Sequence, residues 1–353
     1  MLGTSRQDDA PGRGIRVAFA GVAHWHFTVD ARYLELAQAS GVEIVGLSDD
    51  DEALARQRGD ELGCGWSVDV DDLVTRFKPD LVIALPRPDR APEQVGRLLD
   101  RKVPVFAEKP LGLRAADVWP LVERAEQGWV TVAFPQRYQA FWTAYDRLSS
   151  SGALGTVGHV GVRMVNGPPW RYRDYGVPWM LDPAIAGGGP LRNIGIHAAD
   201  LLRRLFGEQR LTIVGAAQTQ RVHGELIEDF ISALARSEDG VVVNLATGYT
   251  FSPPKPGDLD IHLGAKGAYL IQRRDALTVY PAKGPPEVFR TPDGFNMYRE
   301  IFFDALWRLR AGAPPVATVR DCARANELID DIYAAAATPP PVSAPPAPTP
   351  PTP

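Results

Sequence analysis

The feature that most constrains the fold is a regular alternation of short apolar runs and helix-spaced segments in the first third of the chain. The apolar runs are nearly continuous, as in parallel strands that are buried on both faces. We expect strands at Ile15–Ala20, Val42–Leu47, Leu81–Leu85, Val103–Ala107 and Val130–Ala133. We expect helices at Thr28–Ala39, Asp51–Leu62, Asp71–Phe77, Ala91–Leu99 and Ala115–Gln127. This order predicts a doubly wound parallel sheet of the Rossmann type, which binds ligands at the carboxyl ends of its strands.

The pattern changes after about residue 134. Strand-like runs now follow one another, at Val157–Val165, Leu211–Gln218, Glu228–Ala235, Val241–Thr250, Leu259–Gly264, Ala268–Gln272 and Ala276–Tyr280. Helical spacing occurs at Phe141–Ser150, Ile196–Phe206, Met297–Ala311 and Val319–Ala336. Consecutive strands joined by tight turns predict an α+β domain with a mainly antiparallel open sheet and helices on one face. We therefore expect a Rossmann domain over residues 14–133 and an α+β domain over residues 134–337.

Both ends of the chain have the composition of unstructured segments. Residues 1–13 are polar and rich in glycine and proline, and nine of the sixteen residues in Thr338–Pro353 are proline. Proline removes a backbone donor, and such segments have little apolar surface to bury. We expect a flexible leader at residues 1–13 and a disordered, polyproline-rich tail at residues 338–353.

Charge and cysteine content limit the classes of function. The chain has 38 Lys and Arg against 43 Asp and Glu, so its net charge of −5 provides no basic field for nucleic-acid binding. No run reaches the roughly 18–20 apolar residues that span a bilayer, and the N-terminus lacks a signal-peptide pattern. We expect a cytoplasmic protein with neither a nucleic-acid nor a membrane partner. Cys64 and Cys322 lie far apart and predict reduced thiols.

The turn after the first strand is a degenerate dinucleotide-binding motif. It reads Gly21-Val22-Ala23-His24-Trp25-His26, so the first glycine of a G-x-G-x-x-G motif is present, while alanine and histidine replace the second and third. Such a turn brings backbone N–H groups close to a pyrophosphate. We expect cofactor contacts from Gly21, Ala23, His24, Trp25 and His26. The two histidines have no neighbouring ligands in sequence, so we predict no metal site.

Three aspartates follow the second strand, at Asp49, Asp50 and Asp51. A carboxylate in this place accepts hydrogen bonds from both hydroxyls of an adenosine ribose and repels a 2′-phosphate, which favours NAD over NADP. The same residues also have the composition of a helix N-cap. We expect one aspartate to serve each purpose, with Asp49 at the cofactor.

The strand at Val103–Ala107 ends in Glu108-Lys109-Pro110. A lysine at the carboxyl end of a parallel strand stands beside the ligand cleft, and partial burial there would lower its pKa toward proton exchange. Residue type alone equally describes an ordinary surface lysine in a loop.

Several segments together resemble the Gfo/Idh/MocA family of oxidoreductases. They are the nonapeptide VFAEKPLGL, Gln136-Arg137-Tyr138 followed by Ser151–Gly155, and the run Gly187–His197, which is similar to G-G-G-x-L-x-D-x-G-x-H. The resemblance implies an NAD(P)-dependent enzyme that transfers hydride between nicotinamide and a hydroxyl or keto group of a sugar, cyclitol or related polyol. It also implies a homodimer or homotetramer.

The resemblance carries site residues with it. Lys109 and His197 would exchange the substrate proton, and Asn193 would orient the substrate. Cofactor contacts would also come from Leu85, Pro86, Glu108 and Lys109, and substrate contacts from Arg137, Tyr138, Trp170, Asn193 and His197.

Three departures from the family pattern keep other functions open. Asn193 replaces an aspartate, Arg90 replaces a histidine after the third strand, and the dinucleotide turn lacks two glycines. These changes also fit a glycoside-cleaving member that retains its NAD, or a non-catalytic dinucleotide-binding regulator. The aromatic stretch Asn166–Trp179 fits sugar stacking, a lid packed against its own domain, or a subunit interface.

Overall fold

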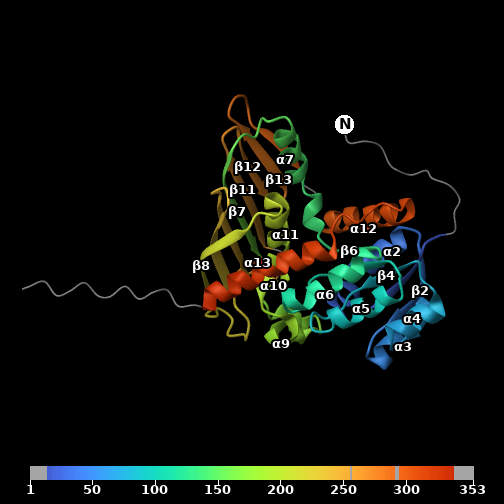
Figure 1. The fold of residues 1–353 in the computed structure, drawn as a ribbon. Helices are drawn as coiled ribbons and strands as arrows, with labels where there is room; N and C mark the ends of the chain where they lie inside the picture. The colour runs from blue at the N-terminus through green and yellow to red at the C-terminus, as the bar shows by residue number, and fades with distance from the viewer. Residues whose placement is uncertain (1–13, 255–256, 291–293, 338–353) are drawn as a thin grey trace, which may run out of the picture.

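The computed structural model describes residues 14–254, 257–290 and 294–337 (Figure 1). The predicted leader and tail lie outside the described residues.

The first half of the chain forms a parallel sheet, as predicted, but with six strands where five were expected, because β3 was not predicted. Its strand order is β3-β2-β1-β4-β5-β6. The strands are β1 (Arg16–Ala20), β2 (Glu43–Ser48), β3 (Gly65–Ser67), β4 (Leu81–Ala84), β5 (Val105–Ala107) and β6 (Val130–Val132). The helices are α1 (Trp25–Thr28), α2 (Arg32–Ala39), α3 (Glu52–Leu62), α4 (Val70–Phe77), α5 (Ala91–Asp100) and α6 (Ala115–Glu126). The order reverses between β1 and β4, so the ligand crevice of such a sheet is expected there.

Alternate side chains of the central strands enter two different hydrophobic cores. Val17 and Phe19 join the core that contains α2, whereas Ala18 and Ala20 join the core that contains α4, α5 and α6. This burial on both faces explains why the strands have nearly continuous apolar sequences.

The first helix of the prediction, Thr28–Ala39, is wrong at its N-terminal end. The structure has two helices, α1 and α2, and Ala31 between them adopts a left-handed conformation with φ of 45°. Asp30 Oδ1 accepts from the backbone N–H of Arg32 at 3.3 Å, and its Oδ2 lies 3.0 Å from His26 Nδ1. Such local side-chain bonds compete with continued helix.

The second half forms an eight-stranded sheet in the order β14-β13-β12-β11-β7-β10-β9-β8. Its strands are β7 (Val157–Val165), β8 (Leu211–Thr219), β9 (Phe230–Ser237), β10 (Val242–Gly248), β11 (Asp258–Ala265), β12 (Ala268–Arg273), β13 (Ala276–Pro281) and β14 (Glu287–Arg290). Strands β7 and β10 pair in parallel, and the other neighbours pair antiparallel. The predicted mainly antiparallel sheet is therefore confirmed.

Short helical turns occupy the segment that the sequence predicted to be irregular. They are α8 (Arg171–Asp174), the 3₁₀ turn η2 (Pro178–Leu181), α9 (Pro183–Ala186) and α10 (Pro190–Asn193). Another 3₁₀ turn, η1 (Pro135–Tyr138), and the helix α7 (Ala140–Ser150) connect the two sheets. Helix α11 (Gly195–Phe206) follows α10 and packs on the second sheet.

The last two helices, α12 (Gly294–Ala311) and α13 (Val319–Ala337), return to the first half of the chain (Figure 1). Ile301, Phe302 and Leu306 of α12 share a hydrophobic core with Val17 and Phe19 of β1. Helix α13 contacts α6, α11 and β8. The domain boundary near residue 133 stays a prediction. A single boundary there also leaves out the packing of α12 and α13 against the first half of the chain.

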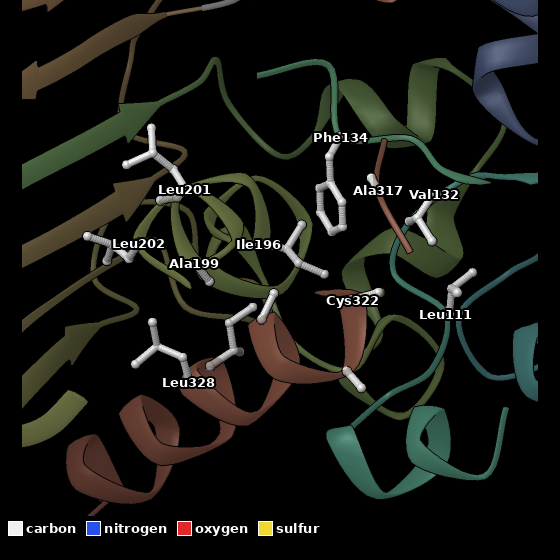
Figure 2. Close-up of a cluster of buried hydrophobic side chains, with 14 of the residues drawn as sticks. Leu111, Val132, Phe134, Ile196, Ala199, Leu201, Leu202, Ala317, Cys322 and Leu328 are labelled. Atoms are coloured by element: carbon white, nitrogen blue, oxygen red, sulfur yellow. The ribbon is translucent and has the colours of Figure 1, made fainter. Parts of the chain in front are cut away.

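A continuous apolar cluster joins the two halves (Figure 2). Leu111 and Val132 contribute from the first half, Ile196 from α11, and Cys322 and Leu328 from α13. Each of these side chains is at most 4% exposed. The two halves of the chain therefore share one buried hydrophobic core, which α11 and α13 help to form.

Candidate functional site

The turn after β1 requires glycine at its first position. Gly21 has φ of +88°, and a Cβ atom built there would lie 2.5 Å from the carbonyl oxygen of Leu85. Its N–H donates to the carbonyl of Ser48 at 2.9 Å. The glycine therefore permits a close approach between the ends of β1 and β4, which is one of the purposes of this glycine in dinucleotide-binding turns.

Asp49 and Asp51 have different hydrogen-bond partners. Asp51 caps α3, because its Oδ1 accepts from the N–H of Leu54 at 3.1 Å. Asp49 Oδ2 instead accepts from the N–H of Ala23 at 2.8 Å and so ties the end of β2 to the turn after β1. Burial raises the pKa of Asp49 to about 6.

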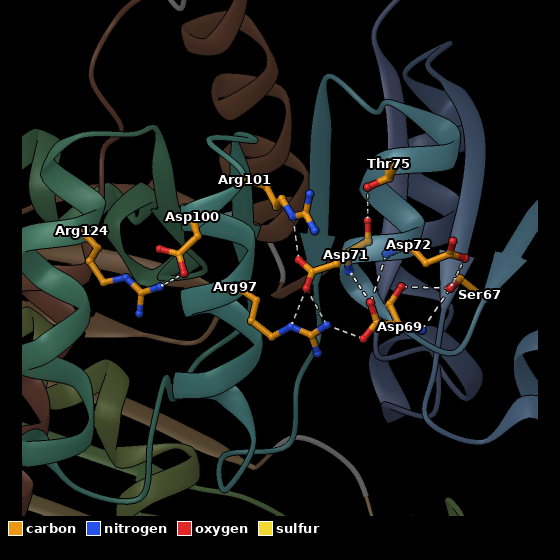
Figure 3. Close-up of polar contacts among 9 residues, drawn as sticks. All are labelled: Ser67, Asp69, Asp71, Asp72, Thr75, Arg97, Asp100, Arg101 and Arg124. Carbon is orange, nitrogen blue, oxygen red and sulfur yellow. Dashed lines mark hydrogen bonds and ion pairs between the residues drawn. The ribbon is translucent and has the colours of Figure 1, made fainter.

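A cleft of about 370 Å³ opens at the carboxyl ends of β1, β2 and β4, and we call it the strand-end cleft. Its lining includes six of the predicted cofactor residues, namely Gly21, Ala23, His24, Asp49, Leu85 and Pro86. One wall contains Arg97 of α5, which pairs with Asp69 and, at 2.7 Å, with Asp71 of α4 (Figure 3). A carboxylate and backbone turn at this point of the sheet are the features that receive an adenosine ribose and a pyrophosphate, so the residues fit an NAD-type cofactor.

His24, in the lining of this cleft, and the nearby His26 are both buried as neutral rings. His24 caps α1, since its Nδ1 accepts from the N–H of His26 at 3.1 Å. Burial, reinforced by nearby cationic groups, lowers the pKa of both histidines well below the ordinary value. In the part of the chain that the structure describes, no three His, Cys, Asp or Glu side chains gather as a metal site would require.

Glu108 and Lys109 follow β5 and are both buried. The Tyr33 hydroxyl donates to Glu108, and Lys109 Nζ lies 3.8 Å from the other carboxylate oxygen. Burial lowers the pKa of Lys109, while the Glu108 carboxylate opposes this shift. Lys109 is thus no ordinary surface lysine.

Asn193 holds the lysine ammonium group in place. Lys109 Nζ donates to the Asn193 carbonyl at 2.9 Å and to Asn193 Oδ1 at 3.0 Å. Asn193 Nδ2 donates to the hydroxyls of Tyr172, at 2.7 Å, and Tyr249, at 2.8 Å. These bonds fix the orientation of the side-chain amide, because an ammonium group can only donate.

His197 lies in the first turn of α11, and its ring is buried against Phe134 with 5.9 Å between ring centroids. Burial, with the Lys109 charge next in importance, lowers its pKa well below the ordinary value. Within the described residues its Nδ1 has no hydrogen-bond partner.

Lys109, Asn193 and His197 line a second space of about 500 Å³, which we call the central cavity. Trp25 and His26 line it from the first half of the chain. A small cavity of about 10 Å³ lies between this space and the strand-end cleft. It is lined in part by His24, Pro86 and Trp179, which also line the cleft, and by Trp25 and Lys109, which also line the central cavity. The structure therefore brings the predicted cofactor residues and the predicted proton-transfer residues to two adjoining spaces.

Three predicted substrate residues are absent from the described lining of both spaces. Arg137 instead pairs with buried Asp200, Tyr138 donates to Asp304 of α12 at 2.5 Å, and Trp170 is 42% exposed. Arg137 and Tyr138 are therefore held by carboxylates within the protein, and Trp170 lies at the surface.

The prediction also did not assign Arg171, Tyr172 and Trp179 individually, although they lie in the aromatic stretch that it singled out. Arg171 and Tyr172 line the central cavity, and Trp179 lines the strand-end cleft. Tyr249 was not predicted at all, because a tyrosine at the end of β10 has no distinctive sequence pattern.

Comparison with known proteins identifies the class to which this fold and site belong. Residues 15–134 match the "Oxidoreductase family, NAD-binding Rossmann fold" and residues 142–269 match the "GFO/IDH/MocA C-terminal domain". The chain therefore belongs to the Gfo/Idh/MocA family, as the sequence motifs predicted.

Two curated relatives are similar in sequence. Trans-1,2-dihydrobenzene-1,2-diol dehydrogenase of Mus musculus is 27% identical over 53% of this chain and 54% of the relative, so the match spans about half of that enzyme. The 1,5-anhydro-D-fructose reductase of Ensifer adhaerens is 24% identical over 69% of this chain and 72% of the relative.

A solved structure has the same fold. Levoglucosan dehydrogenase in complex with NADH and levoglucosan superposes with a TM-score of 0.77, covering 92% of this chain and 97% of that chain at 14% identity. None of the helices among residues 14–254, 257–290 and 294–337 combines the length and apolar character needed to cross a bilayer.

Proposed function

We propose that this protein is an NAD-dependent oxidoreductase that acts on a hydroxyl or keto group of a sugar, cyclitol or related polyol. The observation that carries the proposal is the buried Lys109, held by Asn193 between the strand-end cleft and the central cavity. The relatives and the structural neighbour, which act on diols, anhydrosugars or sugar-like compounds according to their names, support the substrate class.

The cofactor supplies the hydride acceptor or donor when it is bound. Asp49 would receive the adenosine ribose hydroxyls, and the turn at Gly21–Ala23 would face the pyrophosphate. Leu85 and Pro86 would line the same groove. The carboxylate of Asp49 favours NAD over NADP, because a 2′-phosphate beside it would be repelled.

Lys109 is suited to exchange the substrate proton. A buried ammonium group loses its proton more easily than an exposed one, so Lys109 Nζ can accept the hydroxyl proton during oxidation and return it during reduction. The neutral ring of His197 lines the same cavity and is able to accept or donate a hydrogen bond to the same hydroxyl. Asn193 exchanges no proton and positions Lys109.

The test is a panel of polyols and the corresponding ketoses or aldoses with the purified full-length chain and NAD or NADH. The reduced-nicotinamide absorbance should change with at least one substrate, and Lys109→Met should abolish the change while the chain stays folded. Tight NAD binding without turnover on any member of the panel would favour the regulator, and product formation without net NADH would favour the glycoside-cleaving enzyme.

A dimer or tetramer is proposed for the same molecule. The face of the second sheet that points away from α11 exposes apolar side chains, and these are Val214, Leu234, Val242, Tyr280 and Val288. Val214, Leu234 and Val242 lie on the adjacent strands β8, β9 and β10, and Tyr280 and Val288 lie on the adjacent strands β13 and β14. Exposed apolar side chains on a sheet face are typical of an interface between subunits. Light scattering coupled to gel filtration would measure the mass, and a monomer at micromolar concentration would refute the proposal.

A further inference from the structure

The central cavity has more cationic than anionic side chains in its described lining. The cations are Arg32, Lys109, Arg171 and Arg274, and the carboxylates are Asp30 and Asp258. The lining histidines, His26 and His197, are neutral because burial lowers their pKa values.

Arg171 differs from Arg32 and Lys109 in having no carboxylate partner among the described residues. Arg32 lies 2.8 Å from Asp30, and Lys109 lies 3.8 Å from Glu108. The Arg171 side chain has neutral partners only, although the residue is only 7% exposed. A buried charge without a counterion is costly, so a ligand that brings a negative charge would be stabilised here.

The hydrogen bonds of Arg171 leave one edge of its guanidinium group available. Its Nη1 donates to the carbonyl oxygens of Gly167 and, at 2.8 Å, Pro168, and one Nη2–H donates to the Tyr172 hydroxyl at 2.9 Å. A guanidinium group has five N–H donors. Within the described part of the chain, the Nε–H and the second Nη2–H therefore have no partner. Nε and Nη2 are also the two nitrogens with which Arg137 binds the carboxylate of Asp200.

The groups between Arg171 and Lys109 also lack a negative charge. The Tyr172 hydroxyl accepts from Arg171 and from Asn193 Nδ2 and donates to the Tyr249 hydroxyl at 3.4 Å, so its partners are all neutral or cationic. Asn193 is neutral where a carboxylate would have compensated the two cations. The row from Lys109 through Asn193 and Tyr172 to Arg171 thus offers donors and positive charge to a bound molecule.

We propose that the central cavity binds a polyhydroxy acid, with the substrate carboxylate on the Nε–Nη2 edge of Arg171 and a carbinol of the same molecule at Lys109. This assignment deepens the proposed function and rests on it. Two parallel N–H donors match the two oxygens of a carboxylate, and such pairs are among the strongest hydrogen bonds in proteins. A phosphate group also fits two such donors, so the experiment includes a phosphate probe.

The experiment measures binding to the full-length chain saturated with NAD, by titration calorimetry. The acids are D-glucuronate and D-galacturonate, the matched neutral sugars are D-glucose and D-galactose, and D-glucose 6-phosphate is the phosphate probe. We expect each acid to bind about tenfold or more tightly than its neutral partner. Equal affinities, or a preference for the phosphate, would overturn the proposal.

Variants test the role of Arg171 directly. Arg171→Gln should reduce the preference for the acid to nearly one, and Arg171→Lys, which keeps the charge but loses the fork, should retain only part of it. Arg173→Gln is the matched control, because Arg173 lies on the same short helix but is paired with Glu225 away from the cavity lining. Unchanged preference in Arg171→Gln would refute the site.

Asn193→Asp provides a second test that leaves the loop contacts of Arg171 intact. The added carboxylate beside Lys109 and Tyr172 should weaken binding of the acids more than binding of the neutral sugars. Equal weakening for acids and neutral sugars would show that the cavity does not select its ligand by negative charge. NADH formation is recorded in parallel, so that a preserved preference for acids without any hydride transfer would overturn the oxidoreductase function and leave the carboxylate site standing.

Discussion

Replacement of Arg137 by methionine separates a structural role from a substrate contact. The Arg137 side chain is 8% exposed and donates to both carboxylate oxygens of Asp200, through Nε at 2.9 Å and through Nη2 at 2.5 Å. Its Nη1 also donates to the carbonyl of Val316 at 2.5 Å. The Asp200 side chain is only 2% exposed, so the variant would leave a buried carboxylate without its counterion.

Loss of one partner of a buried ion pair costs about 3–5 kcal/mol. At about 2–4 °C per kcal/mol, as for a domain of 150–250 residues, the melting temperature should fall by roughly 6–20 °C. Burial already raises the pKa of Asp200 and the guanidinium opposes that shift, so removing Arg137 should raise this pKa further. The loss of stability should accordingly shrink as the pH is lowered and Asp200 becomes protonated.

The assay is thermal unfolding followed by circular dichroism, with substrate kinetics measured on the same preparations. The double variant Arg137→Met/Asp200→Leu should recover most of the stability, because it removes both charges. Arg147→Met, which breaks an exposed pair with Glu287, should change stability by only about 0–1 kcal/mol. An unchanged melting temperature together with a tenfold higher KM in Arg137→Met would show that Arg137 contacts substrate and that the structural argument is wrong.

Three further predictions concern the cofactor and the proton transfer. Lys109→Met should lower kcat by about 10²–10⁴-fold, because the substrate proton loses its acceptor. The affinity for NAD, measured by fluorescence titration, should change much less. An unchanged kcat would show that Lys109 does not transfer the proton. Gly21→Ala should lower both the melting temperature and NAD affinity because its Cβ would lie 2.5 Å from the Leu85 carbonyl oxygen, whereas Gly63→Ala, with a positive φ but no atom within 4 Å, should lower the melting temperature alone. NAD affinity should weaken as the pH falls through about 6, where Asp49 becomes protonated, and Asp49→Asn should abolish this dependence. Burial raises the pKa of Asp49 above its ordinary 3.8, so Asp49 stabilises the ligand-free protein below about pH 4, and this stabilisation is lost as the pH rises through about 6. The stability of Asp49→Asn, measured relative to the unsubstituted protein, should therefore be higher at pH 8 than at pH 4.

The sequence was most informative where local physics decides the structure. Buried parallel strands need apolar residues on both faces, so the runs around Val17–Phe19 and Leu81–Ile83 were visible without any tertiary information. The helix stop at Gly63 was equally visible, because the left-handed conformation there favours glycine. Strands β3 and β14 were not predicted, because their sequences, GWS and EVFR, are not continuous apolar runs and most of their residues are not buried.

The site was predictable only where residues lie at strand ends or in family motifs. Lys109 and Asn193 belong to such motifs, and the structure joins them by a hydrogen bond across 84 positions of sequence. Arg137 also lies in a motif, but its partner Asp200 is fixed by the docking of η1 against α11, which no local pattern encodes. Tyr249 approaches Asn193 because α10 packs against β10, which Tyr249 follows directly.

The return of α12 to the first sheet has a consequence for the way this molecule can be built and recombined. Residues near the end of the chain, such as Phe302 and Leu306, complete the hydrophobic core around Phe19 and Tyr33. During synthesis on the ribosome, that face of the first sheet must therefore wait for the whole second sheet to emerge before it is covered. A chimera with a relative, spliced at residue 133, would cover one parent's first sheet with the other parent's α12, so exchange of the nucleotide-binding half should succeed only when α12 is transferred with it.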